Sequence, residues 1–138
     1  MMFLLDTNVV SELRRLDKAH SRVARWAESV AADALYISVV TVLELDVGIL
    51  SMERRDPATG GLLRAWMETR VLPSFAGRIV AVDLEVARRC AALHVPDPRP
   101  ERDALIAATA LVKGLVVVTR NDGDFSRIAG LRVVNPWY

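Results

Sequence analysis

Several residue types that support common folds and reactions are scarce in this sequence. Its one cysteine, Cys90, cannot form an internal disulfide, and this usage fits a reducing cytoplasm. It has two histidines and no paired cysteines, no glycine-rich phosphate loop and no Ser/His/Asp nucleophile arrangement. No apolar run is long enough to span a bilayer, and residues 1–5 lack the basic segment of a signal peptide. We therefore expect a soluble, cytoplasmic protein without disulfides and without a membrane partner.

The composition is that of a folded protein. Hydrophobic residues make up 52% and charged residues 25% of the 138 positions, which excludes a largely disordered chain. A chain of this length can bury a substantial core. We expect one domain over residues 1–138.

The formal net charge is +1, and nearly all of the basic residues are arginines. Only Lys18 and Lys113 are lysines among the 18 basic residues, and the others are arginines, which can hold phosphate bidentately. If several acids gathered in one cleft, the surface around them would be basic and would attract a polyanion. Arginine-rich solvated helix faces are the alternative interpretation, and charge alone does not decide between them.

Short apolar runs alternate with helical patterns along the chain. The runs predict strands that end at Leu5, Ser38, Val82, Val118 and Asn135. The helices are predicted over residues 9–15, 23–30, 41–53, 62–73, 84–94 and 103–113, with a loop over residues 54–61. Alternation of this kind indicates an α/β fold with a parallel sheet and right-handed crossovers.

Acidic residues occur where the predicted strands end or where the next helix begins. Because all carboxyl ends of a parallel sheet lie on one edge, these acids should meet there, at Asp6, Glu44, Asp103 and the pair Asp122 and Asp124. Each has a simpler explanation when it is viewed alone. Asp6 could cap a helix beginning near Val9, Thr41 and Glu44 match a capping box, Asp103 could offset a helix dipole, and residues 121–123 could form a turn.

Convergence of these acids on one edge favours a metal site over a set of separate caps. Crowded carboxylates repel and raise one another's pKa unless a cation neutralises them. Hard oxygen ligands without histidine or cysteine indicate Mg²⁺, or Mn²⁺, rather than structural zinc. His94, at a predicted helix end with no matching partner, is expected to be structural or solvated.

An ordered set of short motifs resembles a PIN domain, most closely the VapC/FitB-like toxin ribonucleases. The motifs are Asp6-Thr7-Asn8 with Ser11, Glu44 near a helix start, Asp103 before Ala-Leu-Ile-Ala-Ala, Thr119-Arg120-Asn121 with Asp124-Phe125, and a final Asn135-Pro136-Trp137. The resemblance covers nearly the whole chain. It implies a PIN-like three-layer α/β/α sandwich with a mostly parallel sheet and a Mg²⁺-dependent endoribonuclease that cuts an RNA substrate. It also implies a cognate antitoxin protein and a homodimer.

The resemblance also assigns roles to positions in this chain. Asp6 and Asp103 match the principal metal ligands, Glu44 the second acid and Asp124 the fourth, with Asp122 as an alternative to Asp124. The residues expected to orient the ligands or the substrate are Thr7, Asn8, Thr119 and Asn121. The implied mechanism is hydrolysis by a metal-activated water, with Glu44 or Asp124 orienting that water or accepting its proton.

Two other functions are compatible with parts of the pattern. A phosphatase could use a strand-end aspartate as its nucleophile, but Asp6-Thr7-Asn8 lacks a second aspartate two residues on, and no lysine follows the late strand. A non-catalytic PIN-like module could hold RNA or a partner without cutting it. An intact set of mutually repelling acids argues against that second function. Preference for RNA over DNA rests on the resemblance alone.

Overall fold

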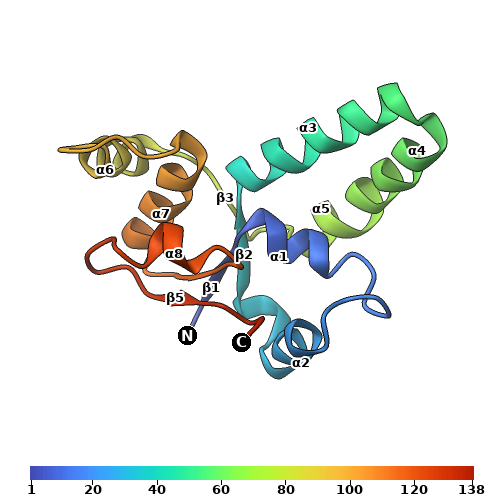
Figure 1. Cartoon of the computed structure of the whole chain (residues 1–138), viewed down its shortest axis with the longest axis horizontal. Helices are drawn as coiled ribbons and strands as arrows, with labels where there is room; N and C mark the ends of the chain where they lie inside the picture. Colours follow the sequence, from blue (N-terminus) through green and yellow to red (C-terminus); the bar gives the residue numbers. More distant parts are fainter.

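A five-stranded parallel sheet forms the centre of the computed structural model, which describes residues 1–138 (Figure 1). Its strands lie in the order β3-β2-β1-β4-β5. Their bounds are β1 (Phe3–Leu5), β2 (Leu35–Ser38), β3 (Ile79–Val80), β4 (Val116–Val118) and β5 (Val133–Val134). The chain starts at the central strand, moves outward to β3, and returns to the other side of β1 as β4. The direction of the strand order therefore reverses between β1 and β4, which is where ligands bind in open parallel sheets.

Helices cover both faces of this sheet. They are α1 (Thr7–Glu12), α2 (Ser21–Ser29), α3 (Val39–Arg55), α4 (Pro57–Trp66), α5 (Leu72–Ser74), α6 (Leu84–Leu93), α7 (Glu101–Lys113) and α8 (Asp122–Phe125), with a 3₁₀ turn η1 (Ala32–Ala34) and a π-helical turn η2 (Met67–Val71). Figure 1 shows α1 to α5 on one side of the sheet and α6 to α8 on the other.

Alternating side chains of the strands build two cores. Phe3 and Leu5 of β1 pack with residues of α1, α3 and η2, whereas Leu4 packs with α7, Phe125 and Ile128 on the opposite face. Because neighbouring side chains of a strand point to opposite faces, a three-residue strand buried on both faces reads as a continuous apolar run. The predicted three-layer α/β/α sandwich is confirmed.

The predicted loop over residues 54–61 is wrong. Asp56 alone separates α3 from α4, capping α4 through its carboxylate with Pro57 in the first turn. Gly60 and Gly61 lie inside α4, and Gly60 faces the backbone of α3: a Cβ at this position would lie 2.4 Å from the Cα of Glu53. Gly60 lets α3 and α4 come into close contact. Two adjacent glycines in a sequence usually indicate a loop, which is why the sequence pattern predicted one here.

The predicted capping box at Thr41 and Glu44 is also wrong. Helix α3 begins earlier, at Val39, because the hydroxyl of Ser38 accepts a hydrogen bond from the backbone N–H of Val40 (3.0 Å). Glu44 therefore lies in the second turn, beyond reach of the helix start, and its side chain is available for another role. Helix α1 likewise begins earlier than predicted, directly after Asp6, and residues 122–125 form a short helix.

His94 has partners that its position in the sequence did not reveal. Its Nδ1 accepts a hydrogen bond from the backbone N–H of Arg99 (3.1 Å), and its Nε2 lies 3.3 Å from Glu101 and 3.8 Å from the buried thiol of Cys90. Because Nδ1 is an acceptor, the neutral imidazole carries its proton on Nε2. These contacts fasten the loop between α6 and α7.

The two adjacent glycines of α4 provide a matched test of the α3–α4 contact. Gly60→Ala should destabilise the protein by about 2 kcal/mol, since its Cβ meets backbone that cannot move aside. Gly61→Ala meets nothing within 4 Å and should stabilise the helix by about 0.5–1 kcal/mol. Chemical denaturation of both variants measures the difference; equal stabilities would contradict the described packing.

Candidate active site

Asp6 lies at the strand-order reversal and is held by hydrogen bonds on both carboxylate oxygens. It is 6% exposed, and its Oδ1 accepts from the backbone N–H of Thr7 at 2.8 Å, which caps α1. Its Oδ2 accepts from the hydroxyl of Thr119 at 2.8 Å. Thr119 directly follows β4, so this bond joins the ends of the two strands on either side of the reversal. Asp6 is thus both a cap and a member of a larger polar group.

Asn8 and the segment after β4 complete this link. The side-chain amide of Asn8 lies 3.4 Å from both Asp6 Oδ2 and the Thr119 hydroxyl, and its Oδ1 accepts from the backbone N–H of Arg120 (3.2 Å). Asn121 contributes its backbone N–H, which donates to the Thr119 hydroxyl at 3.0 Å. These contacts fix the orientation of the Asp6 carboxylate.

Glu44 reaches the same edge from the second turn of α3. Its Oε1 accepts from the hydroxyl of Thr7 at 2.7 Å, and its Oε2 lies 3.8 Å from the guanidinium of Arg102. The sequence pattern identified Thr7 and Glu44 but not Arg102. The position of Arg102 one residue before Asp103 was the only available signal, and an arginine in the first turn of a helix is ordinarily read as a solvated residue.

Asp103 lies in the first turn of α7, and its side chain makes no hydrogen bond within the protein. Burial raises its pKa, and the charges of Asp6, Asp124 and Glu44 raise it further. Burial likewise raises the pKa of Asp6; the hydrogen bonds from Thr119 and Thr7 lower it, while Glu44 and Asp124 raise it. The structure therefore brings Asp6, Glu44, Asp103 and Asp124 into one electrostatically coupled group, here termed the carboxylate cluster.

Asp122 and Asp124 have different surroundings although both lie on α8. Asp122 accepts a hydrogen bond from the side-chain amide of Asn135 at 3.3 Å, which ties α8 to the chain after β5. Asp124 makes no such bond, and its charge acts on Asp6 and Asp103. This contrast favours Asp124 as the acid that faces the site.

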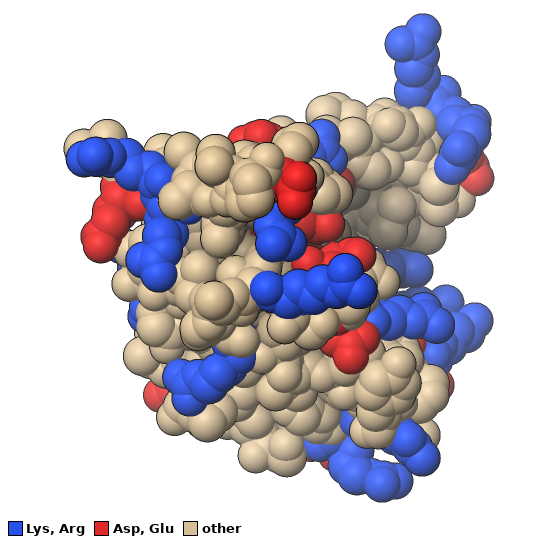
Figure 2. Space-filling model, turned by 60° about the vertical axis from the view of Figure 1, so that its left-hand side comes forward, with Lys and Arg blue, Asp and Glu red and all other residues tan.

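Arginines surround the carboxylate cluster, as the residue usage suggested. Arg99 and Arg127 line a pocket of about 250 Å³ together with Asp103 and Asp124. On the face shown in Figure 2, acidic side chains gather near the middle, with lysine and arginine side chains on either side. An arrangement of this kind attracts a phosphate backbone and places acidic oxygens beside it.

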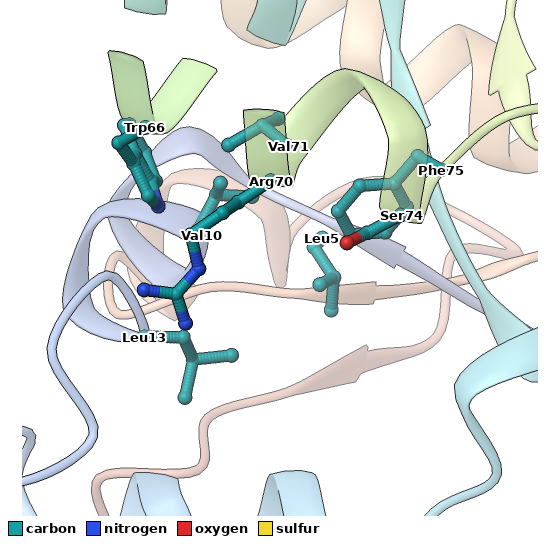
Figure 3. Close-up of a pocket in the computed structure, with 8 residues that line it drawn as sticks. All are labelled: Leu5, Val10, Leu13, Trp66, Arg70, Val71, Ser74 and Phe75. Atoms are coloured by element: carbon teal, nitrogen blue, oxygen red, sulfur yellow. The ribbon is translucent and has the colours of Figure 1, made fainter. Parts of the chain in front are cut away.

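A separate apolar pocket of about 170 Å³ lies on the side of α1 that faces η2 and α5 (Figure 3). Figure 3 shows Leu5 and Val10 in its floor, Trp66 and Phe75 at opposite ends, and the side chain of Arg70 extending across it towards Leu13. No carboxylate lines this pocket.

The residues of the carboxylate cluster fit a divalent cation. Their donor set is entirely carboxylate oxygen, which Mg²⁺ and Mn²⁺ prefer, and burial together with the charge of the neighbouring acids raises the pKa of Asp6 and Asp103. Asp103 and Asp124 line one pocket together, and Glu44 lines a second. Mg²⁺ usually keeps several of its waters, so it does not require all of these acids as direct ligands.

Over residues 3–131 the chain matches the PIN domain, and it belongs to this family. It is 39% identical to plasmid stability protein StbB of Pseudomonas syringae and 36% identical to VapC ribonuclease Y4jK of Sinorhizobium fredii; each comparison covers 99% of this chain and 98–99% of the relative. Toxin FitB of Neisseria gonorrhoeae is 37% identical, with 99% of each chain covered.

Solved structures support the same assignment. The chain superposes on the crystal structure of FitAcB from Neisseria gonorrhoeae with a TM-score of 0.87, at 37% identity over 99% of both chains. A toxin-antitoxin complex from Klebsiella pneumoniae gives a TM-score of 0.68 at 27% identity over 97% of both chains. The resemblance to PIN domains and the fold that it implied are confirmed. No helix is long and apolar enough to cross a membrane.

Removing one charge from the cluster should stabilise the metal-free protein. Because the pKa of Asp103 is raised in the folded protein, ionising this group costs stability; the cost begins to shrink as the pH falls through the folded-state pKa and is gone below the unfolded-state pKa. Asp103→Asn should therefore raise the melting temperature in a chelator at pH 7, and the gain should shrink in acid.

Asp83→Asn is the matched control for that change. The backbone N–H of Val86 and the ammonium of Lys113 lower the pKa of Asp83, so its charge favours folding, and the control should lower the melting temperature or leave it unchanged. A melting temperature for Asp103→Asn below that of the wild type in chelator would contradict the described repulsion.

Proposed function

We propose that this protein is a metal-dependent endoribonuclease and the toxin of a toxin-antitoxin pair. One observation carries the proposal: four acids from distant parts of the sequence are electrostatically coupled at the reversal between β1 and β4. The names of its relatives agree, since one is called a VapC ribonuclease and another a toxin. The fold alone would not be enough to assign nuclease activity, because proteins with the same fold can have many different functions.

Each member of the carboxylate cluster has a role in the proposed reaction. Asp6 and Asp103 would hold a Mg²⁺ ion, for which Mn²⁺ could substitute. When bound, the ion supplies charge neutralisation at the phosphate and lowers the pKa of a water molecule. Glu44, oriented by Thr7, or Asp124 would accept the proton of the attacking water. Asn8 and Thr119 would keep Asp6 in place, and Asn121 would act through its backbone N–H.

Arginines of the rim would position the RNA. Arg99 and Arg127 lie in the same pocket as Asp103 and Asp124, where they can hold phosphates next to the one that is cut. Arg102 lies 3.8 Å from Glu44 and offsets part of the acidic charge. Nothing in this chemistry uses the 2′-hydroxyl as nucleophile, so preference for RNA over DNA follows the relatives and requires a direct comparison of both substrates.

We further propose an antitoxin protein as partner and a homodimer as the assembled state of the toxin. The solved structure from Klebsiella pneumoniae is a toxin-antitoxin complex, and the relative FitB is called a toxin, which supports the first of these. The homodimer follows from the resemblance, and light scattering of the purified protein measures it.

Cleavage of a mixed structured RNA pool tests the activity. Purified protein should cut at discrete positions with Mg²⁺ and not with EDTA, while Asp6→Ala and Asp103→Ala should each reduce the rate by about a hundredfold or more, since each removes a group that acts on the reacting atoms. Gel analysis of matched preparations measures these rates. Cleavage that is equal in all samples would identify a contaminant, and absence of cleavage by protein freed of its antitoxin would favour a binding module.

Asp124→Ala and Asp122→Ala form a matched pair on one short helix. We expect Asp124→Ala to lower cleavage by about a hundredfold, since it removes an acid that faces the cluster. Asp122→Ala removes a partner of Asn135 and should change cleavage by about twofold at most. The reverse order in the same assay would assign the site to Asp122.

A further inference from the structure

Three side chains of different chemistry meet where α6 ends and α7 begins. They are the thiol of Cys90 in the last turn of α6, the imidazole of His94 at the end of that helix, and the carboxylate of Glu101, the first residue of α7. One ligand atom of each lies within 4.8 Å of the other two. None of the three belongs to the carboxylate cluster, and the proposed cleavage reaction does not use them.

The spacing of these atoms resembles the coordination shell of a zinc ion. His94 Nε2 lies 3.3 Å from Glu101 Oε2 and 3.8 Å from Cys90 Sγ. Around tetrahedral Zn²⁺, with bonds of about 2.0 Å to nitrogen and oxygen and about 2.3 Å to sulfur, neighbouring ligand atoms lie about 3.3–3.6 Å apart. The thiol and the imidazole are thus close to this spacing, and the exposed side chain of Glu101 can rotate to complete it.

The two helices hold this arrangement in place. Cys90 and His94 are four residues apart, so they lie on the same face of α6. Cys90 packs against Ala104 and Ala108 of α7 in a buried cluster, which fixes the two helices relative to each other. Residues 95–100, which join the helices, include three prolines that restrict the backbone. Ligands that are positioned in advance lose little conformational freedom when an ion binds.

The donor set differs in kind from that of the carboxylate cluster. A thiolate and an imidazole favour Zn²⁺ and related transition ions, whereas Mg²⁺ prefers oxygen ligands. Burial raises the pKa of the Cys90 thiol, and the charge of Glu101 raises it further, so the thiol keeps its proton at neutral pH when no cation is bound. A bound transition ion reverses this preference, because a coordinating thiol is deprotonated.

Ion binding changes one hydrogen bond of His94. Its Nδ1 accepts from the backbone N–H of Arg99, which leaves the proton of the neutral ring on Nε2. To bind an ion through Nε2, the ring takes its other neutral tautomer, with the proton on Nδ1, and gives up this hydrogen bond. Arg99 has a second attachment, the hydrogen bond of 3.1 Å from its Nε to the carbonyl of Leu93. One hydrogen bond is therefore exchanged for a metal–nitrogen bond.

We propose that Cys90, His94 and Glu101 form a binding site for Zn²⁺ or a chemically similar transition ion, with a water molecule as the fourth ligand. The thiol proton passes to solvent as the metal–sulfur bond forms, so uptake of the ion releases protons. The bound ion links the end of α6 to the start of α7 and braces the segment that carries Arg99, which lies in the pocket beside the carboxylate cluster. This inference does not depend on the proposed nuclease function.

Cobalt(II) tests the site, because it occupies zinc sites and gives an intense near-ultraviolet absorption band when a thiolate binds it. The chain has one cysteine, so this band reports Cys90 alone. Reduced, full-length protein is titrated with Co²⁺, as are Cys90→Ala, Glu101→Gln and two controls. Glu85→Gln removes an exposed acid from the first turn of α6, and Asp103→Asn removes a charge from the carboxylate cluster. Thermal melting of each variant confirms that it is folded.

We expect the wild type to develop the band and to saturate at about one cobalt per chain, with Zn²⁺ displacing the cobalt and Mg²⁺ leaving it bound. Cys90→Ala should lose the band, and Glu101→Gln should weaken cobalt binding about tenfold or more, while both controls bind like the wild type. Absence of the band in reduced wild type would overturn the inference. Equal cobalt affinities for Glu101→Gln and Glu85→Gln would also overturn it, because the thiolate would then bind cobalt without this carboxylate.

Discussion

The hydrogen bond from Thr119 to Asp6 joins the two halves of this fold at the point where the strand order reverses. It spans 113 positions of sequence at a distance of 2.8 Å and can form only if β1 and β4 pair in parallel and in register. The apolar side chains of those strands provide the driving force, since Leu4, Leu5, Val117 and Val118 are almost completely buried. The hydrogen bond between Thr119 and Asp6 therefore depends on the packing of β1 against β4. The orientation of the Asp6 carboxylate depends on this hydrogen bond and on that packing.

Function and stability oppose each other at the carboxylate cluster. Burial and neighbouring charge raise the pKa of Asp6 and Asp103, which means that the folded protein holds ionised groups in an unfavourable place at neutral pH. Elsewhere the same kind of residue supports folding: Asp83 and Asp56 cap α6 and α4, and hydrogen bonds to their carboxylates lower the pKa of each. The contrast agrees with the proposed role of the cluster in holding a cation.

Local patterns in the sequence predicted the strands, the parallel sheet and the acids at its edge. They could do so because Phe3–Leu5 and Val116–Val118 are buried on both faces and are followed at once by polar residues. Predictions from local patterns were wrong where the local structure depends on a contact with a residue far away in the sequence. Gly60 was read as a loop residue because its contact with α3 exists only in three dimensions. Glu44 was placed near a cap because the helix was predicted to run from Thr41, whereas Ser38 caps it and it begins at Val39. The contact between Arg102 and Glu44 depends on the packing of separate helices, which no local spacing describes.

Acids from separate segments form one cation site in the proposed function. Calorimetric titration of metal-free protein with Mn²⁺ at pH 7 tests this site without reference to activity, with Asp103→Asn as the comparison and Asp83→Asn as the control for a charge removed elsewhere. We expect saturable binding by the wild type and by Asp83→Asn, and loss of binding in Asp103→Asn. Equal binding by all three proteins would show that the cation is held outside the carboxylate cluster.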